Sequence, residues 1–370
     1  MKRILIISAN RTGHGHASIA RAVYEQLSLY EDVETEIIDG FSLIGRLAVE
    51  ISGLYDPFVC YAPKAWKVSF DRTARNPGWV TDILTPLLRK RLARKLESSP
   101  PGLILSVHPF FNSSILNNLT ACGEKIPFAI MLADLADIHP LWIDKRADIT
   151  FCPGTDALYA CLSYGLPRHK LHLCSFPTRL AFTEAARAKE KEPYDGNRPL
   201  RCLLMAGGSG AGDLSCTAEI LLRHFNVRLT ILCGRNERLR RSLKETLFGK
   251  RVSLLGFRED VQRFMMNADV ALMRASPNSM MEAVVCGTPL ILTGKLPGQE
   301  ERNPEFAQMR GLGVSCPDVK RLPPLLKGLL ANQAEGLRHI SEKQRATRNL
   351  DAAKEIAAVL VQRTLSTPPA

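Results

Sequence analysis

The sequence predicts an α/β protein of two domains, each with a parallel β-sheet between layers of helices. Short β-branched or leucine-rich runs alternate with helical segments, a pattern typical of such sheets. The alternation restarts at Leu200, and a chain of 370 residues is long enough for two domains. The expected domains cover residues 1–178 and 199–345, with a linker or hinge at 179–198 and a C-terminal helix and tail at 346–370.

Each domain is expected to open with a strand, a glycine loop and a helix. The strands expected in the first domain cover residues 3–9, 33–39, 103–107, 128–132 and 149–152. Those of the second domain begin at Leu200, Val227, Val252, Val270, Leu290 and Val314. The first helix, over residues 17–27, places Ile19, Val23 and Leu27 on one face, as the helical period requires.

Composition excludes several classes of protein. No apolar run approaches the roughly 18 residues that a membrane-spanning helix needs. The N-terminus resembles a weak signal peptide, but Asn10, Arg11 and a glycine loop follow it instead of a cleavage site, which favours a first strand. The ten cysteines form no CxxC pair, so we expect a protein of the reducing cytoplasm with neither a disulfide framework nor a zinc site.

The chain is basic, with 49 Lys and Arg residues against 37 Asp and Glu and a formal net charge of +12. Such an excess suits a nucleic acid, an anionic membrane surface or a phosphorylated ligand. The sequence contains no helix-turn-helix pattern and no other nucleic-acid motif, so nucleic acid is not expected as a partner.

Residues 41–77 interrupt the alternation with a mixture of aromatic and basic side chains. The aromatic ones are Tyr55, Phe58, Tyr61, Trp66 and Phe70, and the basic ones are Lys64, Lys67, Arg72 and Arg75. Residues 81–96 then form an amphipathic helix with Arg89, Lys90 and Arg91 on its basic side. Aromatic and basic residues together are typical of a surface at the lipid headgroup layer. Two readings stay open: a membrane-binding surface, or aromatic residues that fill the core beside an ordinary solvated helix.

Polar and small residues follow the predicted strands of the second domain. They are Gly256-Phe257-Arg258, Ser276-Pro277-Asn278-Ser279, Glu282, and Gln299-Glu300. In a doubly wound sheet the carboxyl ends of the strands face the ligand crevice. Small residues at a helix start suit phosphate, an acid suits a ribose diol, and a Gln-Glu pair suits sugar hydroxyls. The order predicts a nucleotide-sugar site.

A glycine loop follows the first strand of each domain, at residues 13–16 and 207–212. Neither loop matches GxGxxG with an acid about twenty residues further on, so a dinucleotide site is not expected. The first loop carries His14 and His16, and a histidine at the carboxyl end of a strand is suited to take a proton from a hydroxyl nucleophile. The alternative, a histidine that caps its own helix, fits His14 better than His16.

Further motifs point to a known family. They are Gly13 to His16, Ser106-Val107-His108-Pro109, Asp134, His139-Pro140-Leu141-Trp142, Phe176 to Arg179, Gly256-Phe257 and Pro297 to Asn303. On these motifs the chain resembles the lipid-directed glycosyltransferases of the GT-B fold, in particular monogalactosyldiacylglycerol synthases and processive diacylglycerol glucosyltransferases. It is more distantly similar to the peptidoglycan N-acetylglucosaminyltransferase MurG. The resemblance covers nearly the whole chain and implies two Rossmann-like domains that face each other across a cleft.

The resemblance also implies a role for each site residue. In the donor site, the uracil would be framed by Gly256, Phe257 and Arg258, and the ribose would be held by Glu282. The diphosphate would be held by Gly208, Ser209, Gly210 and Ser276 to Ser279, together with Arg179. The donor sugar would be held by Gln299 and Glu300. His16 would be the general base, with Asp134 as its rival or orienting partner. The acceptor and membrane side would involve Gly15, Trp66, His108, His139, Arg89, Lys90 and Arg91, although helix capping is an equal alternative for His108 and His139.

The expected activity is inverting transfer of a hexose, galactose or glucose, from a UDP-sugar to diacylglycerol, without a metal or other cofactor. The expected location is the cytoplasm, peripherally on the inner face of an anionic membrane. Three alternatives stay open: an N-acetylglucosamine-type transferase with another lipid acceptor, a GT-B-shaped UDP-sugar epimerase, and a non-catalytic nucleotide-sugar or lipid-binding protein.

Overall fold

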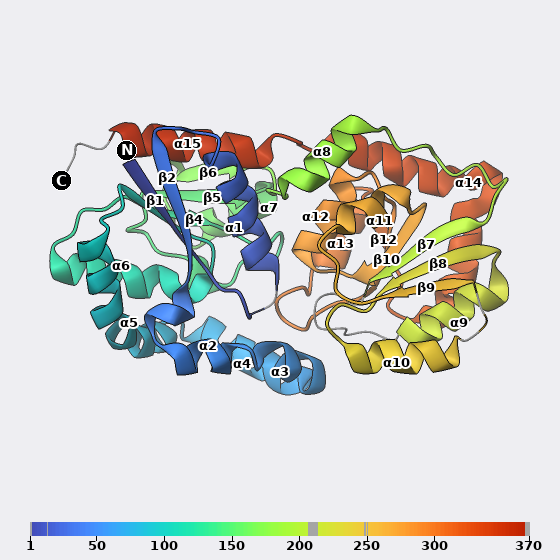
Figure 1. Cartoon of the computed structure of the whole chain (residues 1–370), viewed down its shortest axis with the longest axis horizontal. Coiled ribbons are helices and arrows are strands. Elements are labelled where there is room, and N and C mark those ends of the chain that lie inside the picture. Colours follow the sequence, from blue (N-terminus) through green and yellow to red (C-terminus); the bar gives the residue numbers. More distant parts are fainter. Residues whose placement is uncertain (1, 13, 206–213, 248, 250, 367–370) are drawn as a thin grey trace. The chain divides into compact units, whose positions relative to one another are not determined.

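The chain folds into two compact units in a computed structural model that describes residues 2–12, 14–205, 214–247, 249 and 251–366 (Figure 1). The first unit comprises Met1–Leu180, Pro297–Gln299 and Asp351–Ala370, and the second comprises Ala181–Leu296 and Glu300–Leu350. Each contains one six-stranded sheet in which all neighbouring strands are parallel. The two-sheet α/β fold expected from the sequence is confirmed.

The first sheet has the strand order β2-β1-β3-β4-β5-β6. Its strands are β1 (Lys2–Ser8), β2 (Val33–Asp39), β3 (Leu103–Ser106), β4 (Phe128–Met131), β5 (Ile149–Pro153) and β6 (Leu171–Cys174). The expected strands are all present, and β6 is an addition. Its four residues include His172 between two leucines, too short a pattern to predict a strand.

Helices surround this sheet. They are α1 (His14–Leu27), α2 (Arg46–Ser52), α3 (Tyr55–Tyr61), α4 (Pro63–Arg75), α5 (Gly78–Ser98), α6 (Asn112–Cys122), α7 (Thr155–Ser163) and α15 (Ala352–Ser366), with 3₁₀ turns η1 (Gly40–Leu43), η2 (Pro109–Phe111), η3 (Pro140–Trp142) and η4 (Arg168–Lys170). The C-terminal helix α15 returns to the first unit, where it packs against α1 and the sheet. Ile356 and Leu360 are fully buried there, so the final helix completes the first core.

The second sheet has the order β12-β11-β10-β7-β8-β9. Its strands are β7 (Leu200–Met205), β8 (Val227–Leu232), β9 (Val252–Leu255), β10 (Val270–Arg274), β11 (Leu290–Gly294) and β12 (Gly313–Ser315). Counted from its own first strand, this is the order 3-2-1-4-5-6 of a dinucleotide-binding sheet. All six strands were expected from the sequence.

The helices of the second unit include one inside the expected linker. They are α8 (Leu180–Ala188), α9 (Leu214–His224), α10 (Glu237–Thr246), α11 (Val261–Asn267), α12 (Pro277–Val285), α13 (Asn303–Met309) and α14 (Leu322–Thr347), with the 3₁₀ turn η5 (Val319–Arg321). Phe182 of α8 is fully buried, which gives this part of the linker a packed structure. Helix α14 departs from helical geometry at residues 331–334.

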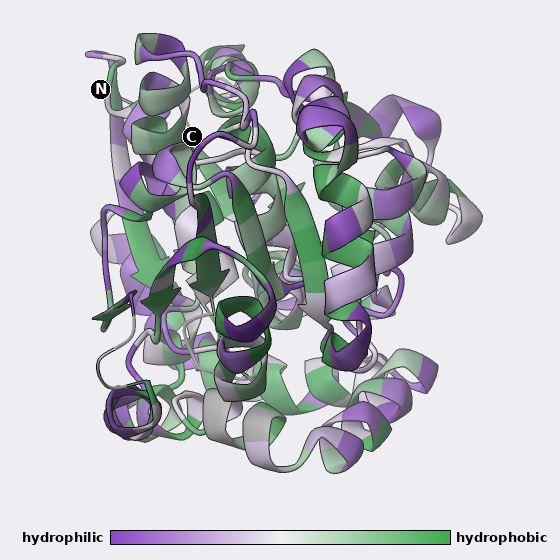
Figure 2. Ribbon diagram, turned by 90° about the vertical axis from the view of Figure 1, so that its right-hand side faces the viewer, coloured by the Kyte–Doolittle hydropathy of each residue, from purple (hydrophilic) through white to green (hydrophobic). Residues whose placement is uncertain are grey.

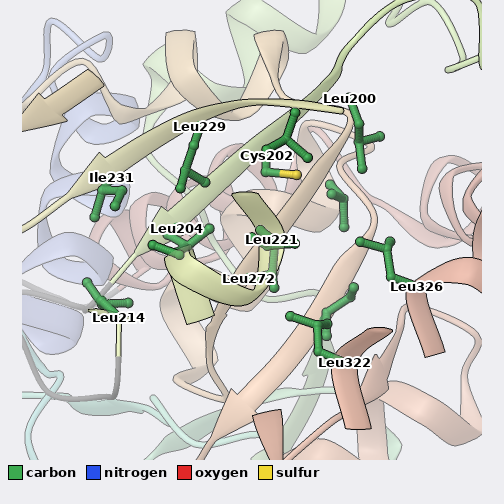
Figure 3. Close-up of a cluster of buried hydrophobic side chains, with 14 of the residues drawn as sticks. Leu200, Cys202, Leu204, Leu214, Leu221, Leu229, Ile231, Leu272, Leu322 and Leu326 are labelled. Atoms are coloured by element: carbon green, nitrogen blue, oxygen red, sulfur yellow. The ribbon is translucent and has the colours of Figure 1, made fainter. Parts of the chain in front are cut away.

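The core of the second unit lies between one face of its sheet and helices α9, α10 and α14. Leu200, Cys202, Leu204, Leu229 and Ile231 from β7 and β8 meet Leu214 and Leu221 of α9 and Leu322 and Leu326 of α14 (Figure 3). Alternate residues of β7 and β8 share this face because side chains alternate along a strand. Figure 2 shows the same division by hydropathy: the strands are mainly hydrophobic, and the helices carry hydrophobic and hydrophilic residues.

Candidate active site

The strand order reverses at one point in each sheet, and ligands of open α/β sheets bind outside the carboxyl ends of the strands at such a point. In the first sheet this point lies between β1 and β3, because β2 occupies the other side of β1. In the second sheet it lies between β7 and β10. The segments after β1 and β3 contain His16 and His108, and the segment after β10 contains Ser276 to Asn278.

A cavity of about 80 Å³ lies at the reversal point of the first sheet. Its lining combines imidazoles, aromatic rings, hydroxyls and one carboxylate. The lining residues are Thr12, His16, Tyr55, Trp66, Ser69, Phe70, Thr73, His108, Pro109, Phe110, Asp134, His139, Leu141 and Gln299. The structure therefore brings together His16, Asp134, Trp66, His108, His139 and Gln299 from the residues expected in the site.

His16 is held in one tautomer by the backbone. It is buried on α1, and its Nδ1 lies 2.8 Å from the carbonyl oxygen of Val107. A carbonyl only accepts hydrogen bonds, so Nδ1 donates and Nε2 carries the lone pair. Burial lowers the pKa of His16 to about 4, against a weaker opposing effect of the Val107 hydrogen bond. At neutral pH the imidazole is uncharged and able to accept a proton at Nε2.

His108 lies beside His16 and caps a 3₁₀ turn. The two imidazole centroids are 4.5 Å apart. Nδ1 of His108 accepts a hydrogen bond of 3.3 Å from the amide of Phe110, so the hydrogen is on Nε2, which donates to Oγ1 of Thr12 at 3.0 Å. Burial, and then the charge of His16, lower the pKa of His108 well below its usual value. His108 therefore combines capping with a place in the cavity wall.

His139 repeats this arrangement on another loop. Its Nδ1 accepts from the amide of Leu141 at 3.1 Å, and Nε2 contacts the carbonyl of Phe70 at 3.3 Å and Oγ1 of Thr73 at 3.2 Å. Burial lowers the pKa of His139 as well. Each of the two histidines precedes a proline at the first position of its 3₁₀ turn. The alternative that the two histidines cap helices is confirmed, and both rings also line the cavity.

Asp134 supplies the carboxylate of the cavity. It is buried, and its Oδ2 accepts a hydrogen bond of 2.7 Å from Nε1 of Trp142. Oδ1 lies 3.5 Å from the amide nitrogen of Gln299, whose side-chain oxygen accepts from the hydroxyl of Tyr55 at 3.1 Å. The indole ring of Trp142 thereby fixes the orientation of the carboxylate.

Aromatic rings from α3 and α4 form one wall of the cavity. Trp66 lies 5.1 Å from Tyr55, 6.3 Å from Phe58 and 6.1 Å from Phe70, measured between ring centroids. Trp66 is half-buried, and Phe58 is 41% exposed. This wall continues from the buried cavity to solvent, so the aromatic residues are neither wholly core nor wholly surface.

The remaining residues expected on the acceptor and membrane side lie on α1 and α5. Gly15 is half-buried in the first turn of α1. Arg89, Lys90 and Arg91 are exposed on α5, and Arg91 donates a hydrogen bond to the carbonyl of Ile44. None of these four residues lines the cavity.

The reversal point of the second sheet presents the start of α12. Ser276 is the extended N-cap residue and Pro277 the first helical residue, and the Ser276 side chain accepts no hydrogen bond from the first turn. The first backbone N–H groups of a helix are able to bind an anion. Ser279 follows in the same turn. Gly208, Ser209 and Gly210, expected to complete a phosphate site, lie outside the described residues.

The second unit has two buried acids near this reversal point, Glu282 on α12 and Glu300 in the loop after β11. Glu282 is 4% exposed, and its Oε1 accepts a hydrogen bond of 3.0 Å from the side chain of Asn278, one turn earlier. Glu300 is equally buried: its Oε2 lies 3.0 Å from Nε of Arg274 and accepts from the amide of Leu296 at 2.8 Å. Burial raises the pKa of Glu300 despite the opposing effect of Arg274. The hydrogen bond from Leu296 to Glu300 thus holds the two ends of the loop after β11 together. Gln299, within this loop, belongs to the first unit.

The residues expected around the uracil follow edge strand β9. Phe257 is 46% exposed, with the guanidinium of Arg235 4.7 Å from its ring centroid. Arg258 forms a bidentate ion pair with Asp260, with both distances 2.8 Å. Gly256 precedes them and is half-buried. Arg179 is half-buried in the last residues of the first unit before α8.

Sequence reasoning missed three partners. Thr12 and Thr73 hold the Nε2 atoms of the two capping histidines, and Arg274 neutralises Glu300. Isolated threonines carry no sequence signal for such a role. The repeated His-Pro pair was the available signal, because proline at the first position of a turn favours a polar cap before it.

Comparison with known proteins supports the resemblance inferred from the motifs. Residues 16–178 match the family model of monogalactosyldiacylglycerol (MGDG) synthase, and residues 214–322 match the glycosyl transferases group 1 model. A probable monogalactosyldiacylglycerol synthase 2, chloroplastic, of Oryza sativa subsp. japonica is 28% identical over 344 residues, covering 86% of this chain and 71% of the relative. Monogalactosyldiacylglycerol synthase 3, chloroplastic, of Arabidopsis thaliana is 26% identical over 362 residues, covering 92% and 77%.

The region similar to MGDG synthases thus precedes the region similar to group 1 glycosyltransferases. The fold of the chain is GT-B. MurG of Acinetobacter baumannii aligns with a TM-score of 0.65 at 14% identity, covering 98% of this chain and 100% of that one. A UDP-GlcNAc 2-epimerase of Neisseria meningitidis, bound to UDP-GlcNAc, aligns with a TM-score of 0.61 at 13% identity and covers 99% and 100%. At these identities the two structures establish the fold alone.

Among the described residues, none of the helices is both long enough and apolar enough to cross a lipid bilayer.

Proposed function

We propose that this protein transfers a hexose from a UDP-sugar to the hydroxyl of diacylglycerol, with inversion at the anomeric carbon. The observation that carries the proposal is the lone pair of His16 Nε2 in a cavity with an aromatic wall and a carboxylate. All of its lining residues except Thr12 and Gln299 lie in the part of the chain that matches MGDG synthases. The named relatives are synthases of a galactolipid, which favours UDP-galactose over UDP-glucose as donor.

His16 acts as the general base in this proposal. The acceptor hydroxyl enters the cavity, His16 Nε2 takes its proton, and the oxygen attacks the anomeric carbon as UDP departs. A base with a pKa of about 4 is weak, so proton transfer is coupled to the departure of the leaving group. The nearby carboxylate of Asp134 favours the imidazolium that forms. The rival assignment makes Asp134 the base, although its Oδ2 already accepts a hydrogen bond from Trp142.

The second unit binds the UDP part of the donor. Backbone N–H groups at the start of α12, with Ser276 and Asn278, stabilise the charge that develops on the leaving diphosphate, without a metal. Glu282 accepts hydrogen bonds from the ribose hydroxyls, and the exposed ring of Phe257 stacks on the uracil.

The α2–α5 segment, residues 46–98, is proposed to bind an anionic membrane. Nine of the sixteen exposed large hydrophobic residues of the described chain lie in it: Leu47, Ile51, Leu54, Phe58, Tyr61, Val68, Trp79, Ile83 and Leu87. Arg89, Lys90 and Arg94 are exposed in the same segment. Exposed apolar residues with basic neighbours suit insertion at the headgroup layer, where the acceptor lipid resides.

Incubation with diacylglycerol vesicles and labelled UDP-galactose, UDP-glucose or UDP-N-acetylglucosamine tests the proposal. The expected product is a labelled glycolipid with inverted anomeric configuration, most of it from UDP-galactose. An epimerase would instead convert the free UDP-sugar without lipid. The proposal is wrong if UDP-sugar binds but no label enters lipid with any of the three donors.

A further inference from the structure

Three arginines lie side by side at the amino ends of adjacent strands in the second sheet. Arg201 of β7 pairs in register with Arg228 of β8. Leu229 pairs with Val252, which places Arg228 beside Arg251, the residue before β9. Neighbouring strands are about 4.8 Å apart, so the backbone positions of the three arginines follow one another at the spacing of the strands. Like charges in opposed positions of a sheet are destabilising, so the row needs an explanation beyond stability.

The three arginines share one face of the sheet. Residues 200, 202, 227 and 229 point into the hydrophobic core, so residues 201 and 228, between them, point to the opposite face. A groove of about 550 Å³ lies over this part of the sheet, bordered by Phe264 and Asn267 of α11. Thr230 and Ser253, two residues beyond Arg228 and Arg251, add hydroxyl groups, and the described lining contains no carboxylate.

The first arginine is fixed and the other two are free of ion pairs with described residues. Arg201 donates to Asp269 at 2.8 Å, and Asp269 is held further by Arg198 at 2.5 Å and by the amide of Arg201. Both carboxylate oxygens of Asp269 accept hydrogen bonds from these two arginines. Arg228 and Arg251 are exposed on the groove side. The groove therefore offers one positioned guanidinium, two unneutralised ones and several hydroxyl or amide groups.

Edge protection does not account for the row. Charged residues on an edge strand prevent pairing with other chains, and β9 is an edge strand. Arg201 and Arg228, however, belong to interior strands, and the row runs across the sheet rather than along its edge. A row across three strands matches a linear ligand with several negative groups.

We propose that this groove, the arginine groove, binds an anion with two or more phosphoryl groups. The planar guanidinium groups match phosphate oxygens through bidentate hydrogen bonds, and the spacing between strands allows adjacent phosphoryl groups to bind adjacent arginines. The groove lies at the amino ends of β8 and β9, whereas Phe257 and Ser276 follow the carboxyl ends of their strands. It is therefore a site separate from the nucleotide residues of the same unit and does not depend on the function proposed above.

Calorimetric titration with inorganic tripolyphosphate, in excess UDP, tests the arginine groove. The double variant Arg228→Gln/Arg251→Gln should bind about tenfold more weakly or worse, since a hydrogen bond to a charged group contributes about 1.5–3 kcal/mol. Arg238→Gln on α10, an exposed arginine outside the groove lining, is the matched control and should bind as the wild type does. Far-UV circular dichroism confirms that the variants remain folded.

Vesicles identify the source of the phosphate. Phosphatidylcholine vesicles with and without phosphatidylinositol bisphosphate are co-sedimented with the wild type and the double variant. A selective loss of phosphatidylinositol bisphosphate binding in the double variant assigns the groove to a lipid headgroup, and a loss of tripolyphosphate binding alone assigns it to a free polyphosphate. Equal binding of both probes by wild type and double variant, or no binding of either probe by the wild type, overturns the proposal.

Discussion

The two units share one architecture but place different chemistry at the same topological position. Each has six parallel strands with a reversal of strand order beside its first strand. The first unit fills that position with buried imidazoles, aromatic rings and a carboxylate. The second offers small polar residues at a helix start and a buried acid. The comparison teaches that the sheet determines where a ligand binds, while the loops after its strands determine which one.

The two sites also differ in the groups that they offer to a ligand: fixed side chains in the first unit and backbone N–H groups in the second. In the first unit, capping bonds and threonine hydroxyls hold His108 and His139, and a backbone carbonyl holds His16. Fixed rings suit proton transfer, which depends on the position of one nitrogen. In the second unit, the groups offered to a ligand are largely backbone N–H groups, which suit a diffuse charge such as a diphosphate. Four predictions test this contrast, from the largest expected effect to the smallest.

Replacing the base should affect turnover and leave nucleotide binding intact. His16→Asn should lower turnover on diacylglycerol by roughly a hundredfold to ten-thousandfold, the usual range for loss of a general base. UDP affinity, measured by calorimetry, should stay unchanged. His169→Asn, an exposed histidine of η4, is the control. Wild-type turnover in His16→Asn would refute the assignment, and a larger loss in Asp134→Asn would transfer it to the carboxylate.

The buried imidazole should make stability depend on pH. The pKa of His16 falls from 6.5 to about 4 on folding, so the unfolded state takes up the proton first and stability is lost as pH falls from about 6.5 to 4. The loss attributable to His16 is up to about 3 kcal/mol. In urea unfolding, wild type should therefore lose more free energy than His16→Asn between pH 7 and pH 4.5. His108 and His139 keep part of the pH dependence in the variant. Parallel curves for the two proteins would contradict the burial argument.

Removing the buried acid of the second unit should affect UDP binding more than turnover, the reverse of what is expected for His16→Asn. Glu282→Ala should weaken UDP binding by about tenfold to a hundredfold, because hydrogen bonds to a charged group are lost. Turnover at saturating donor should fall less than in His16→Asn. Glu245→Ala, on the exposed side of α10, serves as control. Unchanged UDP affinity in Glu282→Ala would remove this residue from the proposed donor site.

Membrane binding should depend on the first unit and on salt. Each basic residue near an anionic surface contributes about 1 kcal/mol, so Arg89→Gln/Lys90→Gln should weaken co-sedimentation with anionic vesicles by about tenfold or more at low salt. The difference should shrink at high salt, because ions screen exposed charges. Arg241→Gln/Lys244→Gln on α10 of the second unit, where both residues are exposed, is the matched control. Binding that is equal at low and high salt, or absent, would contradict the electrostatic part.

The sequence predicted the sheets better than the contacts at their ends. All strands but β6 were expected, because buried parallel strands appear as apolar runs. His16, His108, His139 and Asp134 were also found, since each follows a predicted strand or sits in a recognisable motif. The return of α15 to the first core was not foreseen, because a helix pattern shows its apolar face but not the surface that the face will cover.

By itself, the sequence determined the two α/β repeats, the order of polar motifs after the strands and the presence of histidines at the first reversal point. These features follow from local periodicity and from the spacing of residues along the chain. Only the tertiary structure decided which nitrogen of His16 carries the lone pair, because the carbonyl of Val107 that decides it is 91 residues away in the chain. It also placed Arg228 beside Arg251, since strand register is set by packing of the whole sheet.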